Sequence, residues 1–153
     1  MTSTESVHPA TSMPASRKVL CVVYALIAVA ALVATWTQTI AYTGSGAAFF
    51  GTFWQDTRVN AASRNLTADA LMLSVSVVIL MVVEARKYAV RFVWLYVVGG
   101  VFIAISVVVP LFLIAREIRI GASEPLRLRP LDLILLVVAG IGALSLTAWV
   151  DMG

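Results

Sequence analysis

Four long apolar runs dominate this sequence and limit what the chain can fold into. They cover residues 19–36, 66–85, 92–115 and 131–150. Apolar helices of about 20 residues are long enough to cross a hydrocarbon core of about 30 Å. The chain is 61% hydrophobic and only 12% charged, which is too few charges to cover a soluble globular domain of this size. We therefore expect an all-α, integral membrane four-helix bundle, formed by residues 17–153 as one transmembrane domain.

The segment before the first run has the composition of a disordered tail. Residues 1–16 are rich in Ser, Thr and Pro, and they show no apolar periodicity. His8 lies there without a partner, so we interpret it as a solvated side chain. A cleaved signal peptide is the alternative for the first run, since Arg17 and Lys18 precede it and small residues lie near Ala34.

An uncharged but mixed segment, residues 37–55, separates the first two runs. It contains glycines, polar residues and a cluster of aromatic side chains that includes Phe53 and Trp54. Aromatic rings favour the headgroup layer of a bilayer. We expect a long aromatic-rich loop that is interfacial or re-entrant, and that serves as a structural lid or as an opening for a lipid or other apolar ligand.

Asp69 lies at the start of the second run. We expect Asn65 or Thr67 to cap the helix, which would place Asp69 in the first turn, where the helix dipole favours a carboxylate. The alternative is a functional carboxylate within the membrane boundary, which pairs with Arg58 or Arg64 or binds a substrate.

Small residues and one proline indicate where the helices pack and bend. Small side chains allow neighbouring membrane helices to approach closely. Pro110 cannot donate a backbone hydrogen bond, so a kink is expected there. The candidate packing residues are Gly99, Gly100, Ala139, Gly140 and Ala143.

The distribution of basic residues bears on orientation. Residues 84–91 form a short basic hairpin, and residues 116–130 look like a solvated connection with local ion pairs. Four crossings place both termini on one side of the membrane. Five Lys and Arg residues then lie on that side and six on the other, so the charge count does not favour either orientation. Arg17 and Lys18 before the first helix favour cytoplasmic N- and C-termini in a multi-pass cell-membrane protein.

The central part of the chain resembles a bacterial family of small membrane proteins described as domain of unknown function 2834. The likeness covers residues 36–117, although the family pattern has more aromatic residues between the matching Ser and Asp. The last helix looks like an addition to the family pattern. The resemblance implies membrane residence and no particular activity. The matching residues are Asn60, Ser63, Asp69, Glu84, Arg86, Trp94, Pro110, Leu111, Phe112, Leu113, Arg116 and Glu117.

Several classes of chemistry lack the residues that they need. Haem ligation and serine catalysis require a histidine, and none lies in the apolar runs. Cys21 is the single cysteine, which excludes a paired-thiol oxidoreductase and an intrachain disulfide. The basic residues do not form a nucleic-acid-binding patch. We expect no catalytic residues, no metal ligands and no cofactor.

Two functions remain. The first is a non-enzymatic accessory or structural subunit, which joins a protein partner or forms a homo-oligomer among membrane lipids. The second is a binding or transport module for a lipid or small apolar ligand. Its candidate site residues are Asn60, Ser63, Asp69, Phe53 and Trp54.

Overall fold

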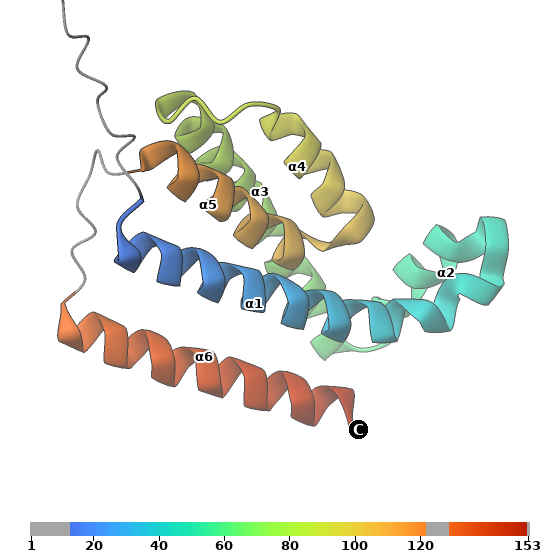
Figure 1. Cartoon of the computed structure of the whole chain (residues 1–153). Helices are drawn as coiled ribbons and strands as arrows, with labels where there is room; N and C mark the ends of the chain where they lie inside the picture. Colours follow the sequence, from blue (N-terminus) through green and yellow to red (C-terminus); the bar gives the residue numbers. More distant parts are fainter. Residues whose placement is uncertain (1–12, 122–128, 153) are drawn as a thin grey trace, which may run out of the picture.

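The computed structural model describes residues 13–121 and 129–152, and every regular element in those ranges is a helix (Figure 1). Most of the expected tail, with His8, lies outside these residues. Four helical runs are long and apolar enough to cross a membrane, as the sequence predicts. They are Ala15–Asp56, Ala61–Lys87, Val93–Ile120 and Pro130–Asp151.

Helix α1, Ala15–Thr39, extends beyond its apolar run at both ends, and its last turns contain threonines. Thr35 and Thr39 donate to the carbonyls of Ala31 and Thr35, each at 2.8 Å, so these polar groups are satisfied within the helix. The chain then continues as the 3₁₀ helix η1, Ile40–Ala48, and as α2, Phe49–Asp56. The chain changes direction at Gly46 within η1, where φ is +54°. The expected loop is therefore a helical hairpin.

Helix α3, Ala61–Lys87, begins several residues before the predicted helix. Asn60 has an extended backbone, and its side chain accepts the N–H of Ser63 at 2.8 Å. Asn60 is therefore the N-cap, and the prediction of a cap at Asn65 or Thr67 was wrong. Asp69 is the ninth residue of α3, not a first-turn acid, so the helix dipole does not explain it.

The third run folds back on itself instead of forming one straight helix. It consists of α4, Val93–Gly99, the π-helical turn η2, Gly100–Ala104, and α5, Ile105–Ile120. Ala104 has an extended backbone, with φ 177° and ψ 141°, and α5 returns beside α4 (Figure 1). The ring centroids of Tyr96 and Phe112 are 5.7 Å apart, whereas sixteen residues of straight helix would separate them by about 24 Å. Pro110 is buried within α5, and the chain reverses at Ala104 instead.

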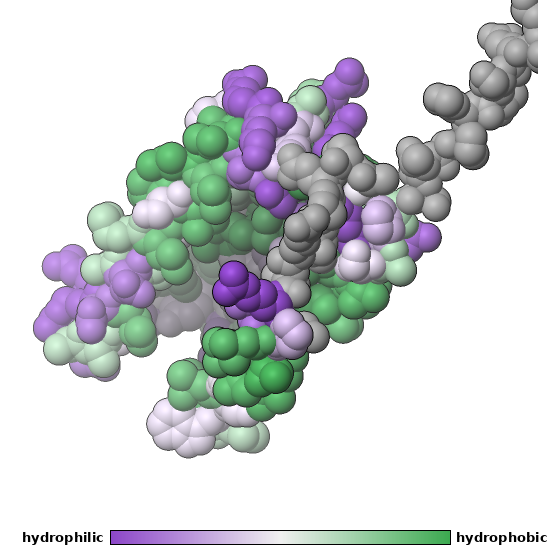
Figure 2. Space-filling view, turned by 90° about the vertical axis from the view of Figure 1, so that its left-hand side faces the viewer, coloured by the Kyte–Doolittle hydropathy of each residue, from purple (hydrophilic) through white to green (hydrophobic). Residues whose placement is uncertain are grey.

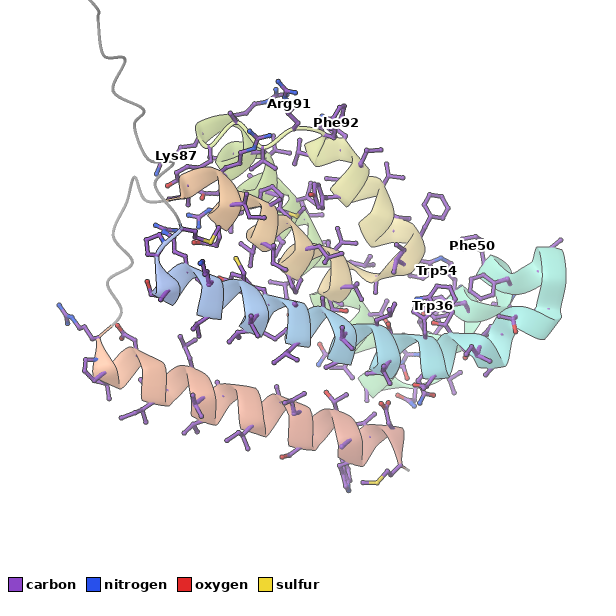
Figure 3. The ribbon with its side chains drawn as sticks, viewed as in Figure 1. Trp36, Phe50, Trp54, Lys87, Arg91 and Phe92 are labelled. Atoms are coloured by element: carbon purple, nitrogen blue, oxygen red, sulfur yellow. The ribbon has the colours of Figure 1, made fainter. Side chains whose placement is uncertain are left out.

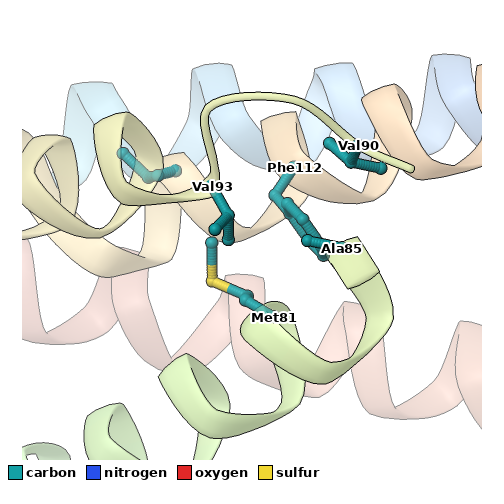
Figure 4. Packing of buried hydrophobic residues seen from close by; sticks show 6 residues of the cluster. Met81, Ala85, Val90, Val93 and Phe112 are labelled. Carbon is teal, nitrogen blue, oxygen red and sulfur yellow. The ribbon is translucent and has the colours of Figure 1, made fainter. Parts of the chain in front are cut away.

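The hydrophobic core lies between this hairpin and the C-terminal half of α3. In Figure 4 Met81 points toward Val93, and Phe112 lies against Ala85. Phe112 is only 1% exposed, which makes it the central core residue. The core residues are Met81, Ala85, Val90, Val93, Val108 and Phe112.

Helix α6, Pro130–Asp151, runs in the same direction as α1. Its start is capped, because the carboxylate of Asp132 accepts the Arg129 N–H at 3.0 Å. Near its other end, Gln38 donates to Asp151 at 3.3 Å. Among the described elements, α6 packs only against α1, whereas α1 packs most extensively against α5.

Candidate functional site

The two ends of the bundle differ in chemistry. Figure 3 shows Trp36, Phe50 and Trp54 at one end, which we call the aromatic end, and Lys87 and Arg91 at the other, the basic end. The aromatic end holds the η1–α2 hairpin, the start of α3 and the end of α6. The basic end holds the starts of α1 and α6, the end of α3 and the end of α5.

The aromatic residues of the hairpin pack mainly against one another. Phe49 and Phe53 stack with ring centroids 6.3 Å apart, and Tyr42 meets Phe53 edge to face at 5.6 Å. The Tyr42 hydroxyl donates to Asp56 at 2.8 Å, which ties η1 to the end of α2. Phe53 is thus a structural residue of the hairpin, whereas Trp54 is 46% exposed.

An open groove of about 350 Å³ lies between α2 and α3. Across the turn that joins the two helices, the guanidinium of Arg64 donates to the carbonyl of Arg58 at 3.1 Å. Both arginines line the groove. Its lining residues are Trp54, Gln55, Thr57, Arg58, Arg64, Thr67, Ala68 and Leu71.

None of the predicted polar site residues lines this groove. Asn60 and Ser63 are joined to each other as the helix cap, and Asp69 is exposed and does not line the groove. Within the described residues, Asp69 forms no salt bridge with Arg58 or Arg64. Trp54 is the one predicted site residue that lines it.

A charged network at the basic end is the polar cluster that the sequence did not predict. Arg17 of α1 forms a buried salt bridge with Glu117 of α5. Arg116 contacts Glu117 at 2.8 Å and also pairs with Glu84 of α3, so the network joins three helices. The Arg116 guanidinium lies 4.8 Å from the ring centroid of Tyr88.

This network corrects the expected solvated connection after residue 115. Residues 116–120 belong to α5, and Glu117 is 2% exposed. Residues 122–128 lie outside the described part. A usable signal was present, since charged residues stand at the ends of three different apolar runs. Nothing in the sequence shows that these ends meet.

The small residues fall into two groups. Gly99 faces α5 within the chain, because a Cβ there would lie 3.5 Å from the side chain of Val108. Gly100 lies against Ile105 in the hairpin turn. A Cβ at Gly140 would meet nothing within 4 Å, and Ala139 and Ala143 are exposed. The α6 group therefore has no packing role among the described residues.

Comparison with known proteins identifies a family. The model of the family "protein of unknown function DUF2834" matches residues 23–118, which is more than half of the chain. This confirms the resemblance seen in the sequence and extends it into α1, while α6 lies beyond the match. No curated protein and no solved structure matches the chain.

Proposed function

The chain belongs to the family of proteins of unknown function DUF2834, and we propose that it is a non-enzymatic, multi-pass membrane protein that acts as an accessory or structural subunit. It joins a protein partner or a second copy of itself through α6. The observation that carries this proposal is the isolation of α6. This helix is long enough to cross a membrane, yet among the described elements it packs only against α1.

The surface of α6 supports association in a bilayer. Figure 2, which faces the basic end, shows α6 at the bottom of the view as a mostly hydrophobic helix, with a hollow between part of it and the helices above. Ala139, Gly140 and Ala143 are open positions with little or no side chain. Since lipid tails are as apolar as leucine, close backbone approach at small residues drives association between membrane helices.

The distribution of charge supports an orientation for this subunit. Because the α4–α5 hairpin enters and leaves at the basic end, only α1, α3 and α6 run between the two ends. The basic end then carries eight described cations and the aromatic end carries Arg58 and Arg64. By the positive-inside rule the basic end is cytoplasmic. The eight are Arg17, Lys18, Arg86, Lys87, Arg91, Arg116, Arg119 and Arg129.

This orientation differs from the one expected from four crossings. The N-terminal helix begins on the cytoplasmic side, and Asp151 lies on the opposite side with Gln38. The Lys and Arg residues are no longer divided almost equally between the two sides, because residues 116–120 return to the same end as residues 84–91.

Native mass spectrometry of the gently extracted protein tests the subunit proposal. We expect a stoichiometric assembly with a partner or a second copy that is lost in Gly140→Leu, since the added side chain blocks close approach. Ser145→Leu is the control, because position 145 lies about 140° around α6 from position 140, so a leucine there should leave the assembly intact. A single chain in the wild type, or an assembly unchanged in Gly140→Leu, would overturn the proposal.

A further inference from the structure

The groove between α2 and α3 changes from cationic to apolar along its length. Arg64, Thr67, Ala68 and Leu71 have the spacing of one helix face, so they line the groove in sequence order. Arg64 is nearest the aromatic end, and Leu71 lies about 10 Å further along the helix axis toward the middle of the bundle. In a bilayer this direction runs from the headgroup layer into the hydrocarbon.

The two arginines at the outer end keep N–H donors for an anion, although one N–H of Arg64 donates to the Arg58 carbonyl. Within the described residues, neither Arg58 nor Arg64 forms a salt bridge with a carboxylate. Asp56 accepts the Tyr42 hydroxyl, and Asp69 does not line the groove. Guanidinium groups bind phosphate oxygens through paired N–H donors, so two of them at one site favour a phosphate group.

Trp54 completes the groove from the α2 side. Its ring is 46% exposed and lines the groove together with Arg58. An indole has an apolar body and one N–H donor, which suits the boundary between headgroups and acyl chains. The groove thus offers a cationic, an amphipathic and an apolar surface in the order in which a phospholipid presents its phosphate, its ester region and its chain.

We propose that this groove binds an anionic phospholipid, with its phosphate between Arg58 and Arg64 and one acyl chain along Ala68 and Leu71. The site is independent of the subunit proposal, because it uses α2 and α3 and not α6. It also differs from the polar set expected from the sequence, since the two arginines replace Asn60, Ser63 and Asp69 as the polar residues that recognise the ligand.

Fluorescence quenching of Trp54 by brominated lipid tests the proposal. The full chain carries Trp36→Phe, Trp94→Phe and Trp149→Phe, so that Trp54 is the single tryptophan. It is placed in phosphatidylcholine vesicles with a minor share of brominated phosphatidylglycerol or of brominated phosphatidylcholine. We expect the binding constant of phosphatidylglycerol beside Trp54 to be at least about fivefold higher than that of phosphatidylcholine. This ratio corresponds to the contribution of one arginine at an anionic surface.

Matched variants separate a binding site from general attraction to anionic lipid. The preference disappears in Arg58→Gln/Arg64→Gln and persists in Arg86→Gln/Arg91→Gln, which removes two charges at the basic end. Equal quenching of Trp54 by the two brominated lipids, in the single-tryptophan protein with both arginines intact, overturns the proposal. A preference for phosphatidylglycerol that survives in Arg58→Gln/Arg64→Gln also overturns it. If a brominated fatty acid quenches Trp54 and neither brominated phospholipid does, the assignment of a phospholipid is wrong.

Discussion

At the scale of single residues, the Arg17–Glu117 salt bridge is the strongest constraint on the fold. Both residues are almost fully buried, at 3% and 2% exposure, and they join helices 100 residues apart in the sequence. A charge left without its partner in such surroundings is costly, whereas the intact pair contributes little net stability relative to apolar residues. The bridge therefore acts by requiring the start of α1 to meet the end of α5.

Removing one partner of this bridge should be more harmful than removing both. We expect Glu117→Gln to lower the free energy of unfolding by about 3 kcal/mol, because the buried salt bridge to Arg17 is broken from one side. The double variant Arg17→Met/Glu117→Leu should recover most of that loss. Circular dichroism during titration of mixed micelles with denaturing detergent measures these differences.

Two control variants make this test specific. Glu84→Gln should cost less than Glu117→Gln, since the Arg116–Glu84 side chains are 24% and 18% exposed and solvent screens them better. Asp69→Asn should leave stability unchanged, because Asp69 is exposed and forms no salt bridge among the described residues. A Glu117→Gln protein as stable as Asp69→Asn would refute the role given to the bridge.

At the scale of elements, the reversal at Ala104 has the largest effect on the architecture. Helix α4 has seven residues and α5 has sixteen, so they extend about 10 and 24 Å. Neither alone crosses about 30 Å of hydrocarbon. Together they form a hairpin whose tip exposes Val101 and Phe102, at 73% and 67%, which suits a re-entrant element with an apolar tip.

A disulfide test distinguishes the hairpin from a straight helix. In a Cys21→Ser background, Gly99→Cys/Val108→Cys should form a crosslink on mild oxidation, because a Cβ at position 99 lies 3.5 Å from the Val108 side chain. In a straight helix these positions would be about 14 Å apart. The shift in gel mobility on reduction reports the crosslink.

The control pair has the same sequence separation within a single helix. Ser106→Cys/Ala115→Cys lies entirely inside α5 and should remain reduced under the same conditions. Failure of the 99–108 pair to crosslink, or equal crosslinking of both pairs, would contradict the reversal.

The sequence predicted the helices better than their connections. Apolar runs locate the four helical segments because burial in lipid requires continuous hydrophobicity, and the fold class is confirmed. The cap at Asn60 was missed because the start of α3 is polar and carries no apolar signal. The reversal at Ala104 was missed because residues 92–115 are apolar throughout, so composition cannot distinguish one long helix from two short ones.

The candidate site was harder to predict than the helices. Trp54 was included because aromatic residues mark interfaces, and it does line the groove. Arg58 and Arg64 were considered only as partners of Asp69. Their joint position depends on how α2 and α3 meet to form the groove, which is a tertiary feature. The Arg17–Glu117 bridge was missed for the same reason, since it depends on which helix ends meet.

At the scale of the whole molecule, the reversal determines at which end of the bundle the described helices begin and end. With α4 and α5 returning to the basic end, α1, α3 and α6 are the described helices that run between the two ends, so the start of α1 and the end of α6 lie at opposite ends. In the orientation that we propose, the eight described cations of the basic end face the cytoplasm. The same orientation would place the groove of Arg58 and Arg64 in the opposite leaflet, while α6 lies at the edge of the bundle.

Accessibility of single cysteines in sealed, right-side-out membrane vesicles tests this arrangement most directly. In a Cys21→Ser background, a membrane-impermeant maleimide should label Met152→Cys from outside. Ser16→Cys should react only after the vesicles are opened, because it lies at the start of α1 beside Arg17. Labelling of both positions from the same side would contradict the reversal at Ala104 and the orientation derived from it.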